Sequence, residues 1–156
     1  MAFEIERKFL VTSDEWRALG APVEMRQGYL ARQPNCVVRV RAAGERGWLT
    51  VKGPSVGFTR REYEVEIPLA EALEMLDLLC VKPLIEKRRT RISAFGLIWE
   101  VDEFLGENLG LIVAEVELSS AEQAITLPAW MGAEVTADPR YYNSNLLIHP
   151  FQNWPR

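Results

Sequence analysis

Charged residues recur at alternate positions along this chain, and the first such stretch shows the pattern most clearly. Between Phe3 and Val11, the residues Glu4, Glu6 and Lys8 alternate with others that are mainly apolar. Side chains two residues apart share one face of a strand, whereas on a helix they point in widely different directions. A strand here therefore places two carboxylates and an ammonium in one row. Such a row either binds a ligand or forms the solvated face of an amphipathic strand.

Six further stretches repeat this alternation, and most of them carry charges of one sign. The acidic rows contain Glu62 and Glu64, Glu100 and Asp102, and Glu115 and Glu117, and the basic rows contain Arg39 and Arg41, Lys52, and Lys87 and Arg89. Two like charges about 4 Å apart repel by roughly 4 kcal/mol at an effective dielectric near 20. A solvated sheet gains little from such rows. We therefore expect a cationic ligand among the acids and an anionic ligand among the bases.

The alternating stretches predict eight strands in a mainly β fold of the α+β class. Turn residues such as Pro34, Gly44 and Gly57 separate neighbouring stretches, which favours antiparallel pairing. The expected strands span residues 3–11, 25–32, 36–42, 48–52, 61–67, 85–91, 99–102 and 113–118. An eight-stranded antiparallel sheet that closes into a barrel has no free edge, and its inward side chains line a lumen. We expect a closed barrel with the charged faces inward, forming a tunnel.

Two helices are expected to cover the outward apolar faces of the strands. In the range 70–80, leucines recur at helical spacing. The range 138–147 opens with Asp138 as a cap and Pro139 at the first helical position. A short helix over residues 120–123 and an apolar turn over residues 128–132 complete the expected elements.

Composition bounds the class of protein. The chain has 156 residues, 48% of them hydrophobic and 26% charged, which fits one globular domain over residues 1–156. The net charge of −4 argues against a broad basic face for duplex nucleic acid. No apolar run approaches the roughly 20 residues that span a bilayer, and the start lacks the pattern of a signal peptide. We therefore expect a cytoplasmic protein that has no membrane partner.

The two kinds of charged row together indicate phosphoryl transfer. Glutamate oxygens are suitable ligands for Mg²⁺ or Mn²⁺, and rows of arginine and lysine suit a polyanion such as a phosphate chain. In phosphoryl transfer, metal neutralisation and positioning of the nucleophile supply most of the catalysis. The chain has no Gly-x-x-x-x-Gly-Lys loop, so side chains would have to bind the phosphates.

The order of these residues resembles the triphosphate tunnel metalloenzyme family, also called the CYTH superfamily. The resemblance rests on Glu4-x-Glu6-x-Lys8 near the N-terminus, on the stretch Arg26–Leu30, and on the ordered charged rows, and it covers nearly the whole chain. The chain is similar in particular to the small bacterial members that hydrolyse inorganic triphosphate. The resemblance implies a closed eight-stranded tunnel, dependence on Mg²⁺ or Mn²⁺, and a triphosphate-containing small molecule as substrate.

The resemblance also implies roles for individual side chains. It places near metal Glu4, Glu6, Glu115 and Glu117, with supporting or second-metal roles for Glu62, Glu64 and Asp102. It assigns phosphate binding to Arg39, Arg41, Lys52, Lys87 and Arg89. Lys8 and Tyr29 would position or activate water. The region Arg140–Asn143 receives no catalytic role, and closing one tunnel end is one option for it.

Several alternatives stay open from the sequence. The family also includes thiamine triphosphatases, class IV adenylate cyclases and RNA triphosphatases. A module that only captures nucleotide or polyphosphate would need bases but few acids, and a structural domain would pair its charges across strands at about 0.2–1 kcal/mol per pair. Acidic and basic rows together favour metal-dependent hydrolysis. The number of metal ions and the oligomeric state, including a homodimer, also stay open.

Overall fold

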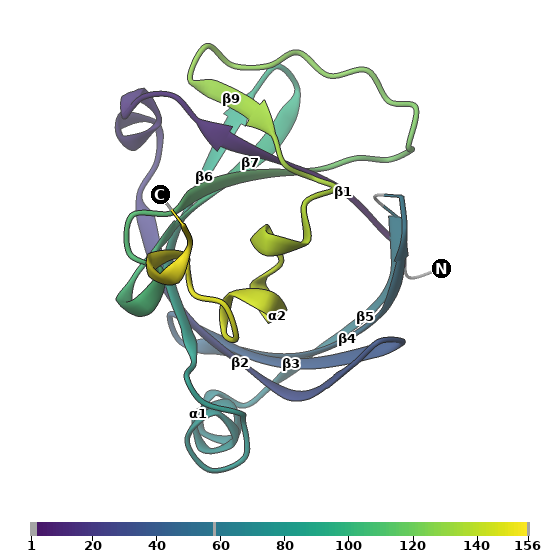
Figure 1. The fold of residues 1–156 in the computed structure, drawn as a ribbon, viewed down its shortest axis with the longest axis vertical. Helices are drawn as coiled ribbons and strands as arrows, with labels where there is room; N and C mark the ends of the chain where they lie inside the picture. Colours follow the sequence, from purple (N-terminus) through teal and green to yellow (C-terminus); the bar gives the residue numbers. More distant parts are fainter. Residues whose placement is uncertain (1–2, 58, 156) are drawn as a thin grey trace.

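A closed antiparallel sheet dominates the computed structural model, which describes residues 3–57 and 59–155 (Figure 1). The strands in this part of the chain are β1 (Phe3–Val11), β2 (Pro22–Gln33), β3 (Cys36–Ala43), β4 (Arg46–Val56), β5 (Thr59–Ile67), β6 (Ile85–Ala94), β7 (Leu97–Phe104), β8 (Ile112–Glu117) and β9 (Met131–Glu134). Their order is β5-β4-β3-β2-β6-β7-β8-β1-β9, and an additional pairing of β5 with β1 closes the first eight into a ring. The eight predicted strands and the tunnel-like fold are confirmed.

Strand β1 has two partners along the edge at which the ring closes. Its first residues pair with β5, with Glu4 opposite Arg60. Its last residues pair on that edge with β9, where Val11 lies opposite Met131. A side chain at Gly132 would come within 3.2 Å of the Leu10 carbonyl oxygen, so glycine permits this close pairing. The predicted apolar turn over residues 128–132 was therefore wrong at its end, where β9 begins.

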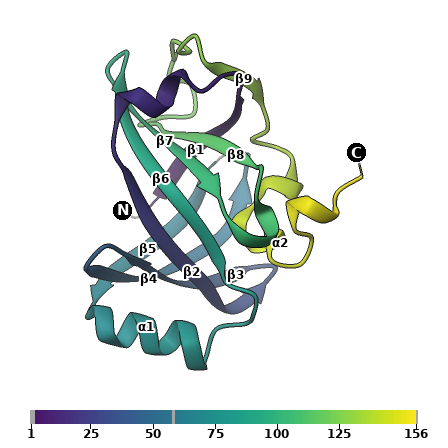
Figure 2. The same cartoon turned by 90° about the vertical axis from the view of Figure 1, so that its left-hand side faces the viewer.

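Helix α1 (Leu69–Leu78) packs on the outside of the ring, as predicted (Figure 2). Its buried residues Ala72 and Leu76 form one apolar cluster with Val40 and Ala42 of β3. Gly47 on β4 lets the helix approach closely, because a Cβ there would lie 2.6 Å from the Cβ of Ala72. A larger apolar cluster, including Phe9 and Trp99, packs on the outward face at another part of the ring. The apolar faces of the strands thus point outward, which leaves the charged faces for the lumen.

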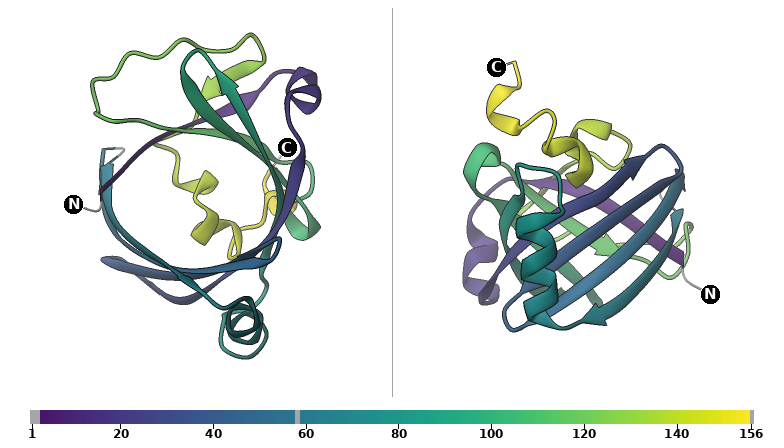
Figure 3. Two further views of the ribbon diagram at one scale, coloured as in Figure 1. Left: turned by 180° about the vertical axis from the view of Figure 1, so that it is seen from behind. Right: turned by 90° about the horizontal axis from the view of Figure 1, so that it is seen from below.

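The C-terminal segment differs from the prediction. Instead of one outer helix over residues 138–147, a 3₁₀ turn (Pro139–Tyr141) is followed by extended backbone at Tyr142 and a short helix α2 (Asn143–Leu146). Viewed along the ring from both ends, α2 lies within its outline (Figures 1 and 3). Leu146 is fully buried in a cluster with Tyr29 of β2. Packing against the inner end of the ring therefore breaks the helix that the local sequence favours.

The other connections are short. Further 3₁₀ turns span Glu15–Leu19, Gly106–Asn108 and Phe151–Asn153. The predicted helix over residues 120–123 was wrong, because the side chain of Gln123 accepts hydrogen bonds from the backbone and hydroxyl of Ser119 and stabilises a turn. None of the described helices is long and apolar enough to cross a membrane.

Candidate active site

The sheet order gathers charges of one sign on each side of the ring. The acidic strands β7, β8, β1 and β5 are consecutive neighbours. The strands β4, β3, β2 and β6 are also consecutive, and the basic rows lie on β4, β3 and β6. An acidic wall therefore faces a basic wall, and the two walls meet at the β4–β5 and β6–β7 seams. The sequence predicted the sign of each strand's row but not this arrangement.

A cavity of about 90 Å³ lies between the two walls, and it brings most of the predicted site residues together. Its lining includes Glu4, Glu6, Lys8, Tyr29, Arg39, Arg41, Lys52, Lys87, Arg89 and Glu115. Strand register explains the grouping, since Lys8 lies opposite Glu115 and Tyr29 opposite Arg39, and opposed residues share a face. The remaining predicted residues lie outside this lining: Glu62, Glu64, Asp102 and Glu117.

Lys52 joins the two walls at the β4–β5 seam. Its Nζ lies 2.8 Å from a carboxylate oxygen of Glu4 and 3.2 Å from one of Glu62. Burial raises the pKa of Glu4, but the hydrogen bond from Glu62 and the charge of Lys52 outweigh it and hold this pKa at about 2. Burial and the same hydrogen bond raise the pKa of Glu62 to about 7. Glu4 is therefore the more acidic carboxyl group of this pair.

Glu6 stands in a different environment. Burial, then the negative charges of Glu115 and Glu4, raise its pKa well above the ordinary value. Its carboxylate makes no hydrogen bond or ion pair with any described residue. Glu115 is held 3.6 Å from Lys8. A carboxylate buried beside two other carboxylates is stabilised by an added cation. Within the acidic wall, a bound cation would therefore be most stabilising next to Glu6.

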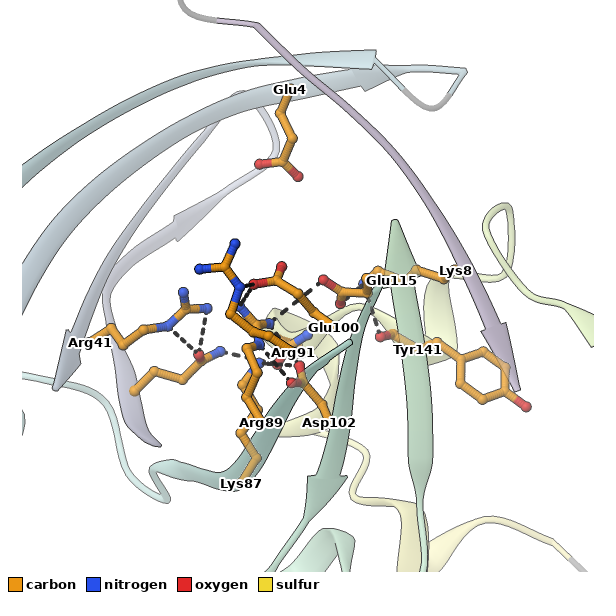
Figure 4. Close-up of polar contacts among 12 residues, drawn as sticks. Glu4, Lys8, Arg41, Lys87, Arg89, Arg91, Glu100, Asp102, Glu115 and Tyr141 are labelled. Carbon is orange, nitrogen blue, oxygen red and sulfur yellow. Dashed lines mark hydrogen bonds and ion pairs between the residues drawn. The ribbon is translucent and has the colours of Figure 1, made fainter. Parts of the chain in front are cut away.

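Asp102 binds the basic side of the tunnel. It is fully buried, and its oxygens accept hydrogen bonds from Lys87 Nζ at 2.7 Å and from Arg89 Nε and Nη2 at 2.7 and 2.8 Å (Figure 4). Although burial acts against ionisation, the charges of Arg89 and Lys87 keep the pKa of Asp102 far below its usual range. Burial, together with the neighbouring arginines, lowers the pKa of Lys87 to about 7. Asp102 therefore holds the cations in place, and its predicted role as a metal ligand stays untested.

A chain of amide groups links Arg41 to Lys87. Gln27 Oε1 accepts hydrogen bonds from Arg41 Nε and Nη2, and Gln27 Nε2 donates to Asn143 Oδ1, which also accepts from Lys87 Nζ at 3.2 Å. Burial lowers the pKa of Arg41 to about 9, and the charges of Arg39 and Arg89 act in the same direction. Gln27 and Asn143 are site residues that the sequence did not predict. For Gln27 a signal was available, because it alternates with Tyr29 on β2.

Arg39 has a hydrogen-bond donor that is available to an anion. Its Nη2 donates to Thr50 Oγ1 at 3.3 Å and lies 3.6 Å from Glu64, whose side chain is 40% exposed. Its Nε is buried without a hydrogen-bond partner. A buried donor without an acceptor is costly, so a ligand oxygen in the cavity would relieve this cost. Glu117, the other exposed member of the predicted metal set, lies opposite Glu6 on the neighbouring strand.

Lys8 lies where the acidic wall meets the C-terminal segment. Its Nζ is 3.4 Å from the carbonyl oxygen of Tyr141 and 5.5 Å from the ring centre of Tyr142. Burial opposes its charge, but the carboxylates of Glu115 and Glu6 raise its pKa. The ammonium therefore stays protonated and able to donate.

The donor set fits a hard divalent cation, although no finished metal site is present. Among the described residues, no three carboxylate, imidazole or thiol groups already converge as a metal site. Glu4 and Glu115 are now paired with lysines, while Glu6 is left without a partner. Carboxylate oxygens are the preferred ligands of Mg²⁺ and Mn²⁺. The carboxylates of Glu4, Glu6 and Glu115 therefore suit such an ion, and the oxygens of Glu6 are available as ligands.

Comparisons with known proteins agree with this architecture. The chain is 51% identical over 154 residues to an inorganic triphosphatase of Acetivibrio thermocellus, covering 99% of both chains. It is 38% identical to an inorganic triphosphatase of Nitrosomonas europaea, covering 93% of this chain and 97% of that one. The crystal structure of the inorganic triphosphatase NE1496 superimposes with a TM-score of 0.66 at 35% identity, covering 95% of this chain and 96% of that one.

The family profile described as CYTH domain matches residues 2–145, which is most of the chain. This match and the near full-length relatives confirm the resemblance inferred from the ordered charged rows. The protein therefore belongs to the CYTH domain family.

Proposed function

We propose that this protein hydrolyses inorganic triphosphate to pyrophosphate and phosphate inside the tunnel, with Mg²⁺ or Mn²⁺ as cofactor. The observation that carries the proposal is the acidic wall facing a basic wall across one small cavity. A linear triphosphate has several charges in line and binds divalent cations, so it matches both walls at once. The names of the relatives support the same activity.

The basic wall would hold the phosphates. Arg39, Arg41, Lys52, Lys87 and Arg89 all line the cavity. Arg39 keeps a buried Nε without an acceptor, and the pKa values of Arg41 and Lys87 are lowered by burial and by like charges. An anion would relieve each of these costs, because it supplies both acceptors and negative charge. The basic wall is therefore preorganised for a polyanion.

The acidic wall would hold the metal. Glu4, Glu6 and Glu115 are the proposed ligands, with Glu117, Glu62 and Glu64 in supporting positions. When bound, the ion would neutralise phosphate charge in the transition state. Lys52 and Lys8 form ion pairs with Glu4 and Glu115, so the proposed metal ligands lie directly beside cations that would face the phosphates.

Lys8 and Tyr29 are proposed to position the attacking water. Both line the cavity, and they come from β1 and β2, which lie on opposite sides of the ring. The raised pKa of Lys8 means that its Nζ donates a hydrogen bond and does not act as a base. Its proposed role is to orient water and to stabilise negative charge on the phosphoryl group.

The other substrates of the family are weaker candidates. A cyclase or a thiamine triphosphatase must also hold an organic group, and the cavity between the two walls is lined mainly by charged and polar side chains. Capture without hydrolysis would not need the row of carboxylates. Cys36 and Cys80 are free thiols, which fits the reducing cytoplasm as the proposed location.

A parallel assay tests the proposal. Purified protein is offered tripolyphosphate, thiamine triphosphate, ATP and pyrophosphate with Mg²⁺ or Mn²⁺, and the products are identified. We expect pyrophosphate and phosphate from tripolyphosphate, at a higher kcat/KM than for the other substrates. Cyclic AMP as the main product, or binding without turnover, would assign the site to one of the alternatives.

A further inference from the structure

A second cavity, here called the outer cavity, adjoins the tunnel cavity and has a volume of about 560 Å³. This volume lies within the roughly 300–1,000 Å³ typical of small-molecule sites. The two cavities share wall residues, among them Ser55, Arg60, Tyr142 and Ser144. Two arginines, Arg32 and Arg60, line the outer cavity, and no carboxylate of the described residues does. A protein of net charge −4 thus carries a local cluster of positive charge beside its tunnel.

Arg32 has a hydrogen-bonding group left over. Its Nη2 donates to Asn145 Oδ1 at 3.0 Å, which fixes the direction of the guanidinium. Its Nε is buried without a hydrogen-bond partner, and no described carboxylate pairs with it. A buried, charged donor of this kind is satisfied when an anionic ligand accepts from it.

Arg60 lines the same cavity from β5, which β4 and β3 separate from the strand of Arg32. It lies opposite Glu4 in the β1–β5 pairing, so its side chain shares the lumen face. Its Nε and Nη2 donate to the Gly53 carbonyl at 3.0 and 2.8 Å. No described residue accepts from Nη1 or forms an ion pair with this arginine. Arg60 is therefore oriented by backbone and keeps its charge available.

We propose that the outer cavity is a second phosphate-binding site, in which Arg32 and Arg60 bind a phosphate group that lies outside the tunnel. Two guanidinium groups that form no ion pair favour phosphate, because the forked donors of a guanidinium match the oxygens of a phosphate group. Ser55 and Ser144 line the same cavity, and a serine hydroxyl is a further donor available to a phosphate. The phosphate is either a free ion or the end of a chain longer than triphosphate that continues out of the tunnel. The second form rests on the proposed function.

The experiment compares Arg32→Gln with two further variants. Arg88→Gln is the matched control, because Arg88 is exposed on β6 and pairs with Glu24 at 3.5 Å, away from both cavities. Asn145→Ala removes the partner of Arg32 but keeps its charge. One arm measures inorganic phosphate binding by titration calorimetry. The other measures the ratio of kcat/KM for tetrapolyphosphate to that for tripolyphosphate.

For a free ion, we expect Arg32→Gln to weaken one phosphate-binding event by about fivefold or more, the scale of a charge-assisted hydrogen bond at a partly exposed site. For a longer chain, we expect the tetrapolyphosphate ratio to fall by a similar factor. Arg88→Gln should keep the wild-type values in both arms, and Asn145→Ala, which leaves the charge of Arg32 in place, should lose clearly less than Arg32→Gln. The calorimetric arm tests the site even if the protein hydrolyses no triphosphate.

Two results would overturn the proposal. The first is a folded Arg32→Gln protein that matches Arg88→Gln in both arms. The second is an Asn145→Ala protein that loses as much as Arg32→Gln, since this would make Arg32 an anchor for the C-terminal segment instead of a phosphate ligand.

Discussion

Replacing Asp102 by asparagine tests how the basic wall is held together. The variant keeps the shape of the side chain but leaves Lys87 and Arg89 without the carboxylate that binds both at 2.7 Å. Breaking a buried ion pair by removing one partner costs about 3–5 kcal/mol. For a domain of this length, about 2–4 °C of melting temperature corresponds to each kcal/mol, so we expect a fall of about 6–20 °C.

Ligand binding should restore part of the stability that Asp102→Asn loses. Tripolyphosphate supplies negative charge to the same two cations, so it should raise the melting temperature of Asp102→Asn more than that of the wild type. Thermal melting with and without tripolyphosphate and Ca²⁺ measures both effects. Asp14→Asn is the control, because Asp14 is an exposed partner of Arg17 and should shift stability by no more than about 0.5 kcal/mol.

The reasoning would be refuted if Asp102→Asn melted with the wild type. A destabilised variant that tripolyphosphate stabilised no more than the wild type would also contradict it. In that case the orphaned cations would not be the groups that bind the anion.

Three further predictions follow from the site. The pKa of Glu62 is raised from 4.5 to about 7 in the folded protein, so the free energy of unfolding falls as the pH rises from 4.5 to about 7. Glu62→Gln removes this titrating group, and the fall in melting temperature between pH 5.5 and 8 should therefore be smaller than in the wild type by about 2–6 °C. Lys8→Ala and Tyr29→Phe should each lower kcat about tenfold or more with a smaller change in KM, and steady-state kinetics showing only a raised KM would reassign both to binding. Gln27→Leu removes the partner of both Arg41 and Asn143, so it should cost about 1–3 kcal/mol in urea unfolding and raise KM for tripolyphosphate; an unchanged midpoint and KM would make this amide chain irrelevant.

The sequence predicted the strands and their inward faces because a period of two leaves little choice. Once Glu4, Glu6 and Lys8 alternate with residues of the opposite face, one register buries the apolar side chains and puts the charges in the lumen. The neighbours of each side chain were harder to predict. Asp102 belongs to an acidic row by sequence, but its position opposite Arg89 at the β6–β7 seam makes it a partner of the cations.

The C-terminal segment could not be predicted from local signals. Asp138 and Pro139 mark a helix start, yet the chain leaves helical geometry at Tyr142. Asn143 then bonds Lys87 and Gln27, and Leu146 packs in the cluster that contains Tyr29. These contacts link residues more than 50 positions apart, and no pattern within the segment encodes them.

The two walls together are proposed to form the active site of a metal-dependent triphosphatase. The direct measurement is the release of phosphate and pyrophosphate from tripolyphosphate by the purified protein, with Mg²⁺ or Mn²⁺ and with excess chelator, for the wild type and for Glu6→Gln. We predict turnover only with the metal, and a loss of about 100-fold or more in kcat/KM for Glu6→Gln, the scale of removing one group that stabilises transition-state charge. Full activity in chelator, or a fully active Glu6→Gln enzyme, would contradict the account.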